Sequence, residues 1–330
     1  MEEKRSFKLN FRGRELVVEV GELAKQANAA CLVKYEDTTI LSACVMSKKA
    51  SSADFFPLTI NYQEKFYSVG KIPGGFIKRE GRPTEQAVLA ARLIDRPIRP
   101  LFAEGFRNEV QVVNTVLSVD QDCTPEMTAL FASSLSLCIS DIPFDGPVAG
   151  VVVGRVNGEY IINPSVEQLE NSDITLSVAG TRDAINMVES GSREVSEEAM
   201  IDAIMFGHEA IKELVDFQEE IVKEIGKEKI VVELAKLDEE LVNEVNEFAT
   251  SKMLDAIQIK DKLEKYAAID KVKEDSVSYF EEKYSDNEEL DKLLNDVKKI
   301  VDNIEANEVR RLITEEHIRP DGRDMDEIRP

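Results

Sequence analysis

The sequence has 330 residues, of which 43% are hydrophobic and 32% are charged, and this is enough for two or three folded domains. No apolar run approaches the roughly 18 residues of a membrane span, and the charged first residues lack the apolar centre of an export signal, so we expect a cytoplasmic protein without membrane association. Four cysteines without CxxC spacing and only two histidines disfavour a disulfide framework, a zinc site and a Ser-His-Asp centre.

The first two thirds of the chain predict alternating strands and helices. Thr84 is expected to cap one of the helices at its N-terminus, and Pro97 is expected to stop it. The expected elements, in chain order, are a hairpin turning at Arg12-Gly13, a hairpin turning at Glu36-Asp37, a strand at 57–63, a helix at 84–96, a strand at 109–119, a buried helix at 125–140, a hairpin turning at Asn157-Gly158, a strand pair at 173–190 and a long helix at 196–225.

The last third has a different character. Residues 233–312 place apolar side chains at helical spacing and carry no clear strand signal, so we expect a separate helical domain. Residues 213–330 hold 34 acidic and 19 basic residues, so most of the formal net charge of −23 lies in this part. A solvated helix surface is the ordinary interpretation of such charge.

The end of the sequence, HIRPDGRDMDEIRP (317–330), starts with turn residues and continues with charges, as the opening of a new folded unit would. Fourteen residues are too few to bury a core. We therefore expect this chain to be a fragment of a longer protein.

One window reverses the sign of the charge. Between Lys65 and Arg107 there are nine basic and four acidic residues. A local excess of positive charge can attract a polyanion even when the whole protein is acidic. The alternative for any single residue is structural: Arg92 could pair with Asp95, Arg96 could bind carbonyls at a helix end, and Phe76 could pack into the core.

The geometry of the window favours single-stranded nucleic acid. Gly70, Gly74 and Gly75 surround Pro73, which predicts an exposed loop able to adopt positive φ. Phe76 follows, beside cations, so a base could stack on its ring while phosphates meet the charges. Neither a GxxxxGK[ST] nor a GxGxxG motif is present, which disfavours a nucleotide-hydrolysing phosphate loop.

Three stretches resemble the polynucleotide phosphorylase (polyribonucleotide nucleotidyltransferase) family. They are FFPLTINYQEKFYSVGKIPGGFIKREGRPTEQAVLAARLIDRPIRPLF (55–102), NMVESGSREVSEEAM (186–200) and the terminal HIRPDGRDMDEIRP. The resemblance implies an α+β fold with RNase PH-like (ribosomal protein S5 domain 2-like) mixed sheets and helices, followed by a small all-α domain. It implies a first RNase PH-type domain at 1–228 (subdomains about 1–144 and 145–228), a helical domain at 233–312 and the truncated start of a second RNase PH-type domain at 313–330.

The family activity implied is phosphate-dependent degradation of RNA from its 3′ end, a reversible reaction that releases nucleoside diphosphates. Inorganic phosphate is the co-substrate, and Mg²⁺ is expected to bind in the second RNase PH-type domain. The implied partners are single-stranded RNA, two further copies in a trimeric ring and proteins of an RNA-degradation complex, without DNA specificity.

The resemblance carries over RNA contacts but no catalytic or metal residue. The family usually has two aromatics and two arginines after the glycines, whereas this sequence has Phe76-Ile77-Lys78-Arg79, so one aromatic is lost and Lys78 lacks the guanidinium fork. Asp120 and Asp122 are as readily parts of a loop as of a metal site. The expected RNA-binding residues are Phe76, Lys78, Arg79, Arg82, Arg92, Arg96 and Arg99.

Three functions remain open at this point. The first is the RNA-binding half of a phosphorolytic exoribonuclease, with this chain inactive alone. The second is a non-catalytic RNA-binding and ring-scaffold protein. The third is an acidic adaptor that binds proteins through its helical domain.

Overall fold

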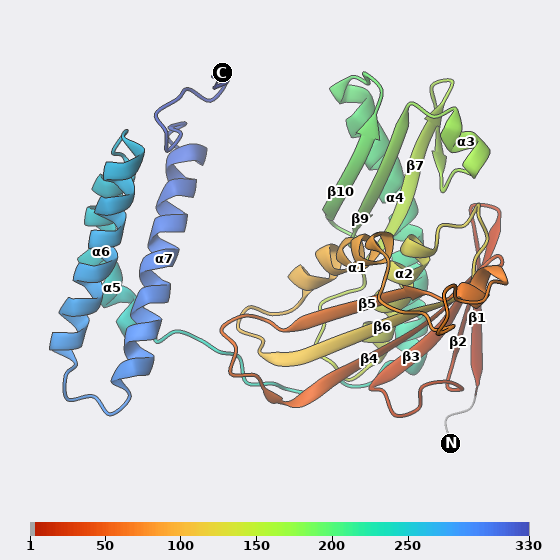
Figure 1. The fold of residues 1–330 in the computed structure, drawn as a ribbon, viewed down its shortest axis with the longest axis horizontal. Helices are drawn as coiled ribbons and strands as arrows, with labels where there is room; N and C mark the ends of the chain where they lie inside the picture. Colours follow the sequence, from red (N-terminus) through yellow and green to blue (C-terminus); the bar gives the residue numbers. More distant parts are fainter. Residues whose placement is uncertain (1–3, 330) are drawn as a thin grey trace. The chain divides into compact units, whose positions relative to one another are not determined.

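The computed structural model describes residues 4–329, which form two compact units (Figure 1). The first unit extends to Ala235, and the second begins at Lys236. Each unit has its own hydrophobic core, and each is described separately below.

The larger sheet of the first unit has the strand order β1-β2-β3-β4-β6-β5. Its strands are β1 (Arg5–Phe11), β2 (Arg14–Val20), β3 (Ala29–Tyr35), β4 (Thr38–Ala50), β5 (Leu58–Glu64) and β6 (Asn108–Ser118). Both expected hairpins are confirmed, with Phe11 opposite Arg14 and Tyr35 opposite Thr38. The pair β5 and β6 is parallel, and the other pairs in this sheet are antiparallel.

The smaller sheet is antiparallel and has the order β10-β9-β7-β8. Its strands are β7 (Ala149–Val156), β8 (Glu159–Ile162), β9 (Ile174–Gly180) and β10 (Ile185–Ser192). The expected turn at Asn157-Gly158 joins β7 to β8. The short helix α3 (Val166–Glu170) follows β8, and the long helix α4 (Glu197–Ile225) packs against β7 and β9.

Two helices lie against the larger sheet, α1 (Glu85–Ile98) and α2 (Pro125–Ile139). Thr84 caps α1 as expected, since its hydroxyl accepts a hydrogen bond from the backbone N–H of Ala87 at 3.1 Å. The prediction that Pro97 stops this helix is wrong. The helix includes Pro97 and passes into a short 3-10 turn, η2 (Arg99–Leu101). A proline in the last turn removes one backbone hydrogen bond, while the Arg99 N–H still bonds to the Asp95 carbonyl.

Helix α2 is buried on every side, and its C-terminal end is closed by a lysine from a distant part of the chain. The Lys229 Nζ donates to the carbonyls of Leu137, Cys138 and Ser140 at 2.9, 2.9 and 2.7 Å. Because the last carbonyls of a helix have no partner within it, this one ammonium group satisfies acceptors at the end of α2. Of the three, the Leu137 carbonyl also accepts from the backbone N–H and the hydroxyl of Ser140. Burial of Lys229 lowers the pKa of its ammonium group.

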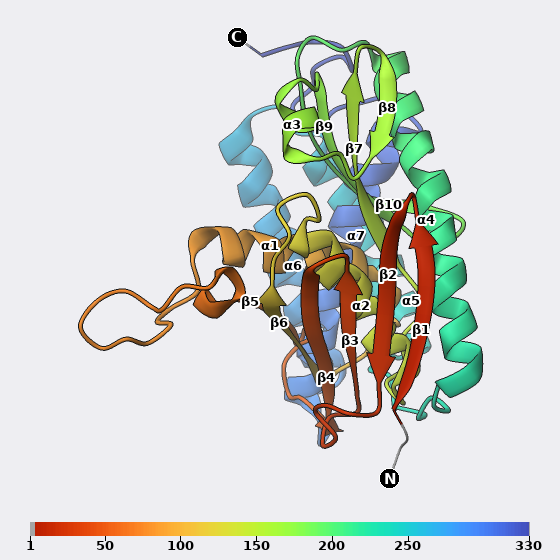
Figure 2. The same cartoon turned by 90° about the vertical axis from the view of Figure 1, so that its right-hand side faces the viewer.

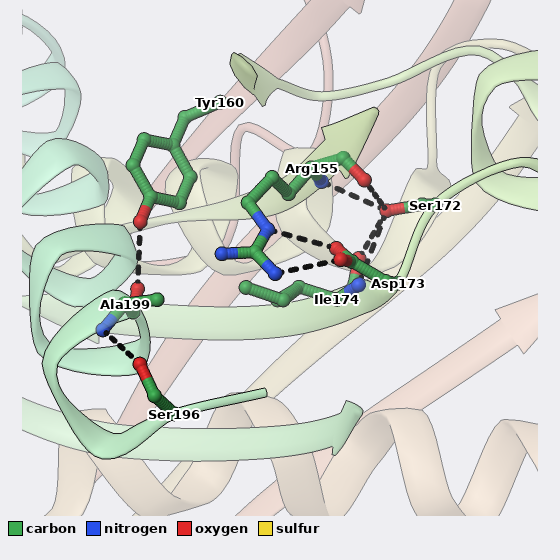
Figure 3. Close-up of polar contacts among 7 residues, drawn as sticks. All are labelled: Arg155, Tyr160, Ser172, Asp173, Ile174, Ser196 and Ala199. Carbon is green, nitrogen blue, oxygen red and sulfur yellow. Dashed lines mark hydrogen bonds and ion pairs between the residues drawn. The ribbon is translucent and has the colours of Figure 1, made fainter. Parts of the chain in front are cut away.

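A polar network fixes the small sheet and the start of α4 (Figure 3). Arg155 on β7 makes a bidentate ion pair with Asp173, with nitrogen–oxygen distances of 2.9 and 2.6 Å, and this guanidinium lowers the pKa of the Asp173 carboxyl. Tyr160 on β8 donates to the Ala199 carbonyl at 2.8 Å. Ser196 caps α4 by accepting from the Ala199 N–H at 3.3 Å. The first turn of α4 is therefore held against β8.

The second unit contains the helices α5 (Glu239–Ile257), α6 (Lys262–Lys283) and α7 (Leu290–Thr314). Its core includes Val245, Met253, Phe280 and Val297. The expectation of helical segments in the last third of the chain is confirmed, and the first of them begins at Glu239. All four cysteines are free and buried. Among the described residues, no helix is both long enough and apolar enough to cross a bilayer.

We expect Lys229→Met to lower the free energy of unfolding by about 2 kcal/mol, because three carbonyls at the end of α2 lose a charged donor while the aliphatic volume is kept. The matched control is Lys227→Met, which removes one exposed bond to the Asn28 carbonyl. Urea denaturation followed by circular dichroism measures both. Equal losses in the two variants would contradict the role given to Lys229.

Candidate nucleic-acid interface

The candidate interface begins in the long loop between β5 and α1, which projects from the first unit (Figure 2). A 3-10 turn, η1 (Phe66–Val69), opens the loop and ends at Gly70, whose φ is +69°. Gly75 has a φ of +71°, so two of the three expected glycines occupy the left-handed region. Lys78 also has a positive φ of 54°, which the sequence did not indicate.

The tip of this loop holds apolar and basic side chains in water. Phe76 is fully exposed, and Ile77 is 74% exposed, so the alternative in which Phe76 packs into the core is excluded. Lys78 and Arg79 follow directly in the chain and are exposed, and Arg82 is exposed beyond Glu80; within residues 4–329 none of these three cations forms an ion pair. An exposed ring next to unpaired cations is an arrangement that suits a base and its phosphates.

The base of the loop is closed by an acid. Both carboxylate oxygens of Glu80 lie near the backbone N–H of Phe66, at 3.3 and 3.4 Å. Because Phe66 and Glu80 are 14 residues apart, this contact brings the two ends of the loop together. The residues between them are thereby presented outward as one projection.

The three arginines of the α1 region differ in what they contact. Arg92 is exposed and forms no ion pair within the described part of the chain. Arg96 pairs with Glu189 of β10. Arg99 makes two bonds of 2.8 Å to Asp95 and also donates to the carbonyls of Phe56 and Leu58. The pairing of Arg92 with Asp95 is therefore not the one formed, since Asp95 binds Arg99.

The structure divides the basic window into two groups. The loop group is exposed, with cations that have no carboxylate partner among residues 4–329, and consists of Lys78, Arg79 and Arg82. The helix group lies on α1 or just after it, and two of its members already bind groups of the protein: Arg96 and Arg99. The loop group is accordingly the stronger candidate for contact with a polyanion.

A cluster of acidic and hydroxyl side chains at the root of the loop was not foreseen. Tyr62 donates to Glu64 at 2.8 Å at the end of β5, and Glu126 stands in the first turn of α2. Burial raises the pKa of Glu126, and the charge of Glu64 raises it further, while a hydrogen bond from Gln86 opposes this. An acid in a first helical turn is ordinarily explained by the helix dipole, so no sequence signal revealed this partial burial.

Asp120 and Asp122 accept backbone hydrogen bonds that stabilise the loop that contains them. Asp120 accepts from the Asp122 N–H at 2.9 Å, and Asp122 accepts from the Val166 N–H at 2.9 Å. Among the residues that the structure describes, no three His, Cys, Asp or Glu side chains are grouped so that they could hold a metal ion.

Three family models match the chain. They are the 3′ exoribonuclease family, domain 1, at residues 12–143; the 3′ exoribonuclease family, domain 2, at 146–210; and the RNA binding domain of polyribonucleotide nucleotidyltransferase at 240–324. The first two matches fall in the first unit, and the third falls in the helical unit.

Curated relatives agree with these matches. The polyribonucleotide nucleotidyltransferases of Enterococcus faecalis and Bacillus velezensis are each 60% identical over 329 residues. The matches cover 100% of this chain but 47% and 46% of those relatives, so the chain spans about half their length.

A solved structure supports the fold alone. The crystal structure of rice (Oryza sativa) Rrp46 matches with a TM-score of 0.50 and 15% identity, covering 67% of this chain and 96% of that chain. The expectation of an RNase PH-like α+β fold followed by helices is thereby confirmed.

We expect Glu126→Gln to raise stability near pH 7. Protonation of a half-buried acid with a raised pKa favours the folded state, so the free energy of unfolding falls as the pH rises from the ordinary value of 4.5 through the folded value. In the Glu126→Gln variant, the free energy of unfolding should not show this decline with rising pH. Urea denaturation between pH 4 and 8 measures it, with Glu85→Gln, an exposed acid in the first turn of α1, as the control. An unchanged pH dependence in Glu126→Gln would overturn the assignment.

Proposed function

The chain belongs to the polyribonucleotide nucleotidyltransferase family and corresponds to the N-terminal half of its full-length relatives. We propose that it is the RNA-binding half of a phosphate-dependent 3′-to-5′ exoribonuclease. In the complete enzyme, inorganic phosphate attacks the phosphorus of the terminal phosphodiester of RNA. The bond from that phosphorus to the 3′ oxygen of the penultimate nucleotide breaks, so the terminal nucleotide leaves as a nucleoside diphosphate and the shortened RNA keeps a 3′-hydroxyl. The reverse reaction extends RNA. The task of this half is to hold and orient the RNA chain.

One observation carries this proposal: the projecting loop presents a fully exposed aromatic ring beside cations that the protein has not paired. Stacking of one base on Phe76 contributes about 1–3 kcal/mol. Lys78, Arg79 and Arg82 can each meet a phosphate, and every neutralised phosphate releases counterions. Sequence readout by such a surface is weak, because every base has a face that can stack.

The chemical step is proposed to lie outside this half. Phosphoryl transfer needs a positioned phosphate and a cation that stabilises the developing charge. The acids that the sequence offered for a metal, Asp120 and Asp122, accept backbone hydrogen bonds of their own loop and of the residue that begins α3. The described residues therefore do not fit a Mg²⁺ centre, and we assign Mg²⁺ to the second RNase PH-type domain of the family enzyme, which residues 313–330 would begin.

The finer family properties are proposals of the same kind. We place the protein in the cytoplasm, in a ring of three copies with single-stranded RNA as its ligand and RNA-degradation proteins as further partners. We keep Arg92, Arg96 and Arg99 in the RNA path, with Arg92 as the member of this group that forms no ion pair within residues 4–329. The alternative is a non-catalytic RNA-binding and ring-scaffold protein.

We expect the 330-residue chain to bind RNA without releasing nucleoside diphosphates. The assay supplies RNA with a 3′-hydroxyl, inorganic phosphate and Mg²⁺, and the products are separated by chromatography. A full-length family enzyme serves as the positive control. Release of nucleoside diphosphates by the chain alone would show that the chemistry lies in this half.

We expect Phe76→Ala to weaken RNA binding by about 1–3 kcal/mol with an unchanged salt dependence, whereas Phe76→Tyr should keep the affinity. Changing Lys78, Arg79 and Arg82 together to alanine should weaken binding and flatten the slope of log affinity against log salt by about two. The matched control changes three exposed lysines elsewhere in the first unit: Lys25, Lys48 and Lys49.

Fluorescence anisotropy of a labelled RNA at several salt concentrations measures these effects. If the loop triple variant and the control triple variant lose the same affinity and the same slope, the loop is an ordinary charged surface and the proposed interface is wrong.

A further inference from the structure

A concave site lies in the helical unit, far along the chain from the loop. It is a hollow of about 770 Å³ between the start of α6 and the segment after α7. Ile257, Ile269 and Val309 supply its apolar lining. Its volume falls in the range of pockets that hold small organic ligands, and an apolar floor with a few polar groups is the usual composition of such pockets.

The hollow reverses the charge of the unit around it. Residues 236–330 hold 27 acidic and 16 basic side chains. The lining of the hollow holds six basic residues and three acidic ones. The six basic residues are Lys260, Lys262, Lys265, Arg319, Arg323 and Arg329. A concave cationic site in a strongly acidic unit points to an anionic ligand.

Two of the three acids in the lining are already paired. Glu305 binds Lys273 of α6 at 2.9 Å, and Asp321 binds Arg323 at 2.6 Å. These pairs leave the ammonium groups of Lys260 and Lys262 without an ion pair anywhere in residues 4–329. The positive charges of Lys260 and Lys262 are therefore available to a ligand.

Other cations hold the wall of the hollow in place. The Lys265 Nζ donates to the Pro320 carbonyl at 2.5 Å, and Arg319 donates to the Glu327 carbonyl at 2.8 Å. These contacts fasten the segment after α7 onto α6 and onto itself. The shape of the hollow consequently depends on these hydrogen bonds of Lys265 and Arg319.

An aromatic ring stands beside the available charges. Tyr266 is 52% exposed, and the Lys262 ammonium lies 5.9 Å from the centre of its ring. Lys262 and Tyr266 are four residues apart on α6, so they share one face of the helix. A base stacked on Tyr266 would bring its phosphate within reach of the neighbouring lysines.

We propose that this hollow binds a nucleotide, with the base on the ring of Tyr266 and the phosphate at Lys260 and Lys262. The nucleotide is either a unit of an RNA chain or a free nucleotide, since both offer a base and a phosphate. The site shares no residue with the loop of Phe76, and it assigns residues to the unit whose family model is described as an RNA binding domain.

The absence of tryptophan from the sequence allows a direct test. Tyr266→Trp places a single tryptophan in the hollow, and a base that stacks on it should quench its fluorescence. The matched control is Tyr279→Trp on the same helix, where the ring stacks on Phe248 outside the hollow. The probes are a short adenine RNA, adenosine diphosphate and inorganic phosphate.

We expect saturable quenching of the indole fluorescence in the Tyr266→Trp variant and none in the Tyr279→Trp variant. Quenching by both adenosine diphosphate and the RNA identifies a free-nucleotide site, and quenching by the RNA alone identifies a contact for an RNA chain; either supports the proposal. Absence of quenching by all probes, or quenching by inorganic phosphate alone, overturns it, provided that circular dichroism shows folded helices.

Two variants in the Tyr266→Trp background test the phosphate contacts. Lys260→Ala with Lys262→Ala should weaken binding about tenfold or more, whereas the control pair Lys271→Ala with Lys292→Ala removes the same charge outside the hollow and should leave it unchanged. Equal losses in both pairs would contradict the proposal. Because the signal comes from residue 266, the result is independent of the loop variants, so each interface can fail without the other.

Discussion

The burial of α2 on all sides is the constraint on which the first unit depends. Every residue from Met127 to Ile139 is buried, and the helix contacts β3, β4 and β6 of the larger sheet and β7 of the smaller one. A helix without a solvent face must be enclosed, so both sheets have to pack against it. Its buried hydroxyl groups form hydrogen bonds within the protein: Ser134 accepts from the Val148 N–H, and Ser133 donates to Asn114. Lys229 completes the enclosure at the C-terminal end.

That enclosure decides where the projecting loop can be. The edge strand β5 is parallel to β6, so the chain has to cross over between them, and the crossover contains both the loop and α1. Helix α1 packs on β5 and α2 and thus fixes the end of the loop at Thr84, while Glu80 and Phe66 close its base. The frame therefore fixes both ends of the loop that it presents to a ligand.

Local features could be predicted from the sequence, and long-range ones could not. The hairpins and the Thr84 cap depend on a few adjacent residues, and they were predicted correctly. Arg96 finds its partner, Glu189, 93 residues away, and the half-buried environment of Glu126 depends on the packing of three elements. The error at Pro97 has the same origin, since the proline rule describes a helix interior and this proline lies in the final turn.

Because the chain as a whole is acidic, binding of a polyanion depends on cations that contact its phosphates directly. At physiological ionic strength charges are screened over about 8 Å, so the net charge of −23 acts weakly on a phosphate held at contact distance by a nearby cation. Cations already paired with carboxylates, such as Arg99, add little attraction for a phosphate. By contrast, Lys78, Arg79 and Arg82 form no ion pair within residues 4–329, so their charges can pair with a ligand. Charge alone would also attract other anions. The exposed ring of Phe76 supplies what the cations lack, because stacking favours a ligand that carries bases.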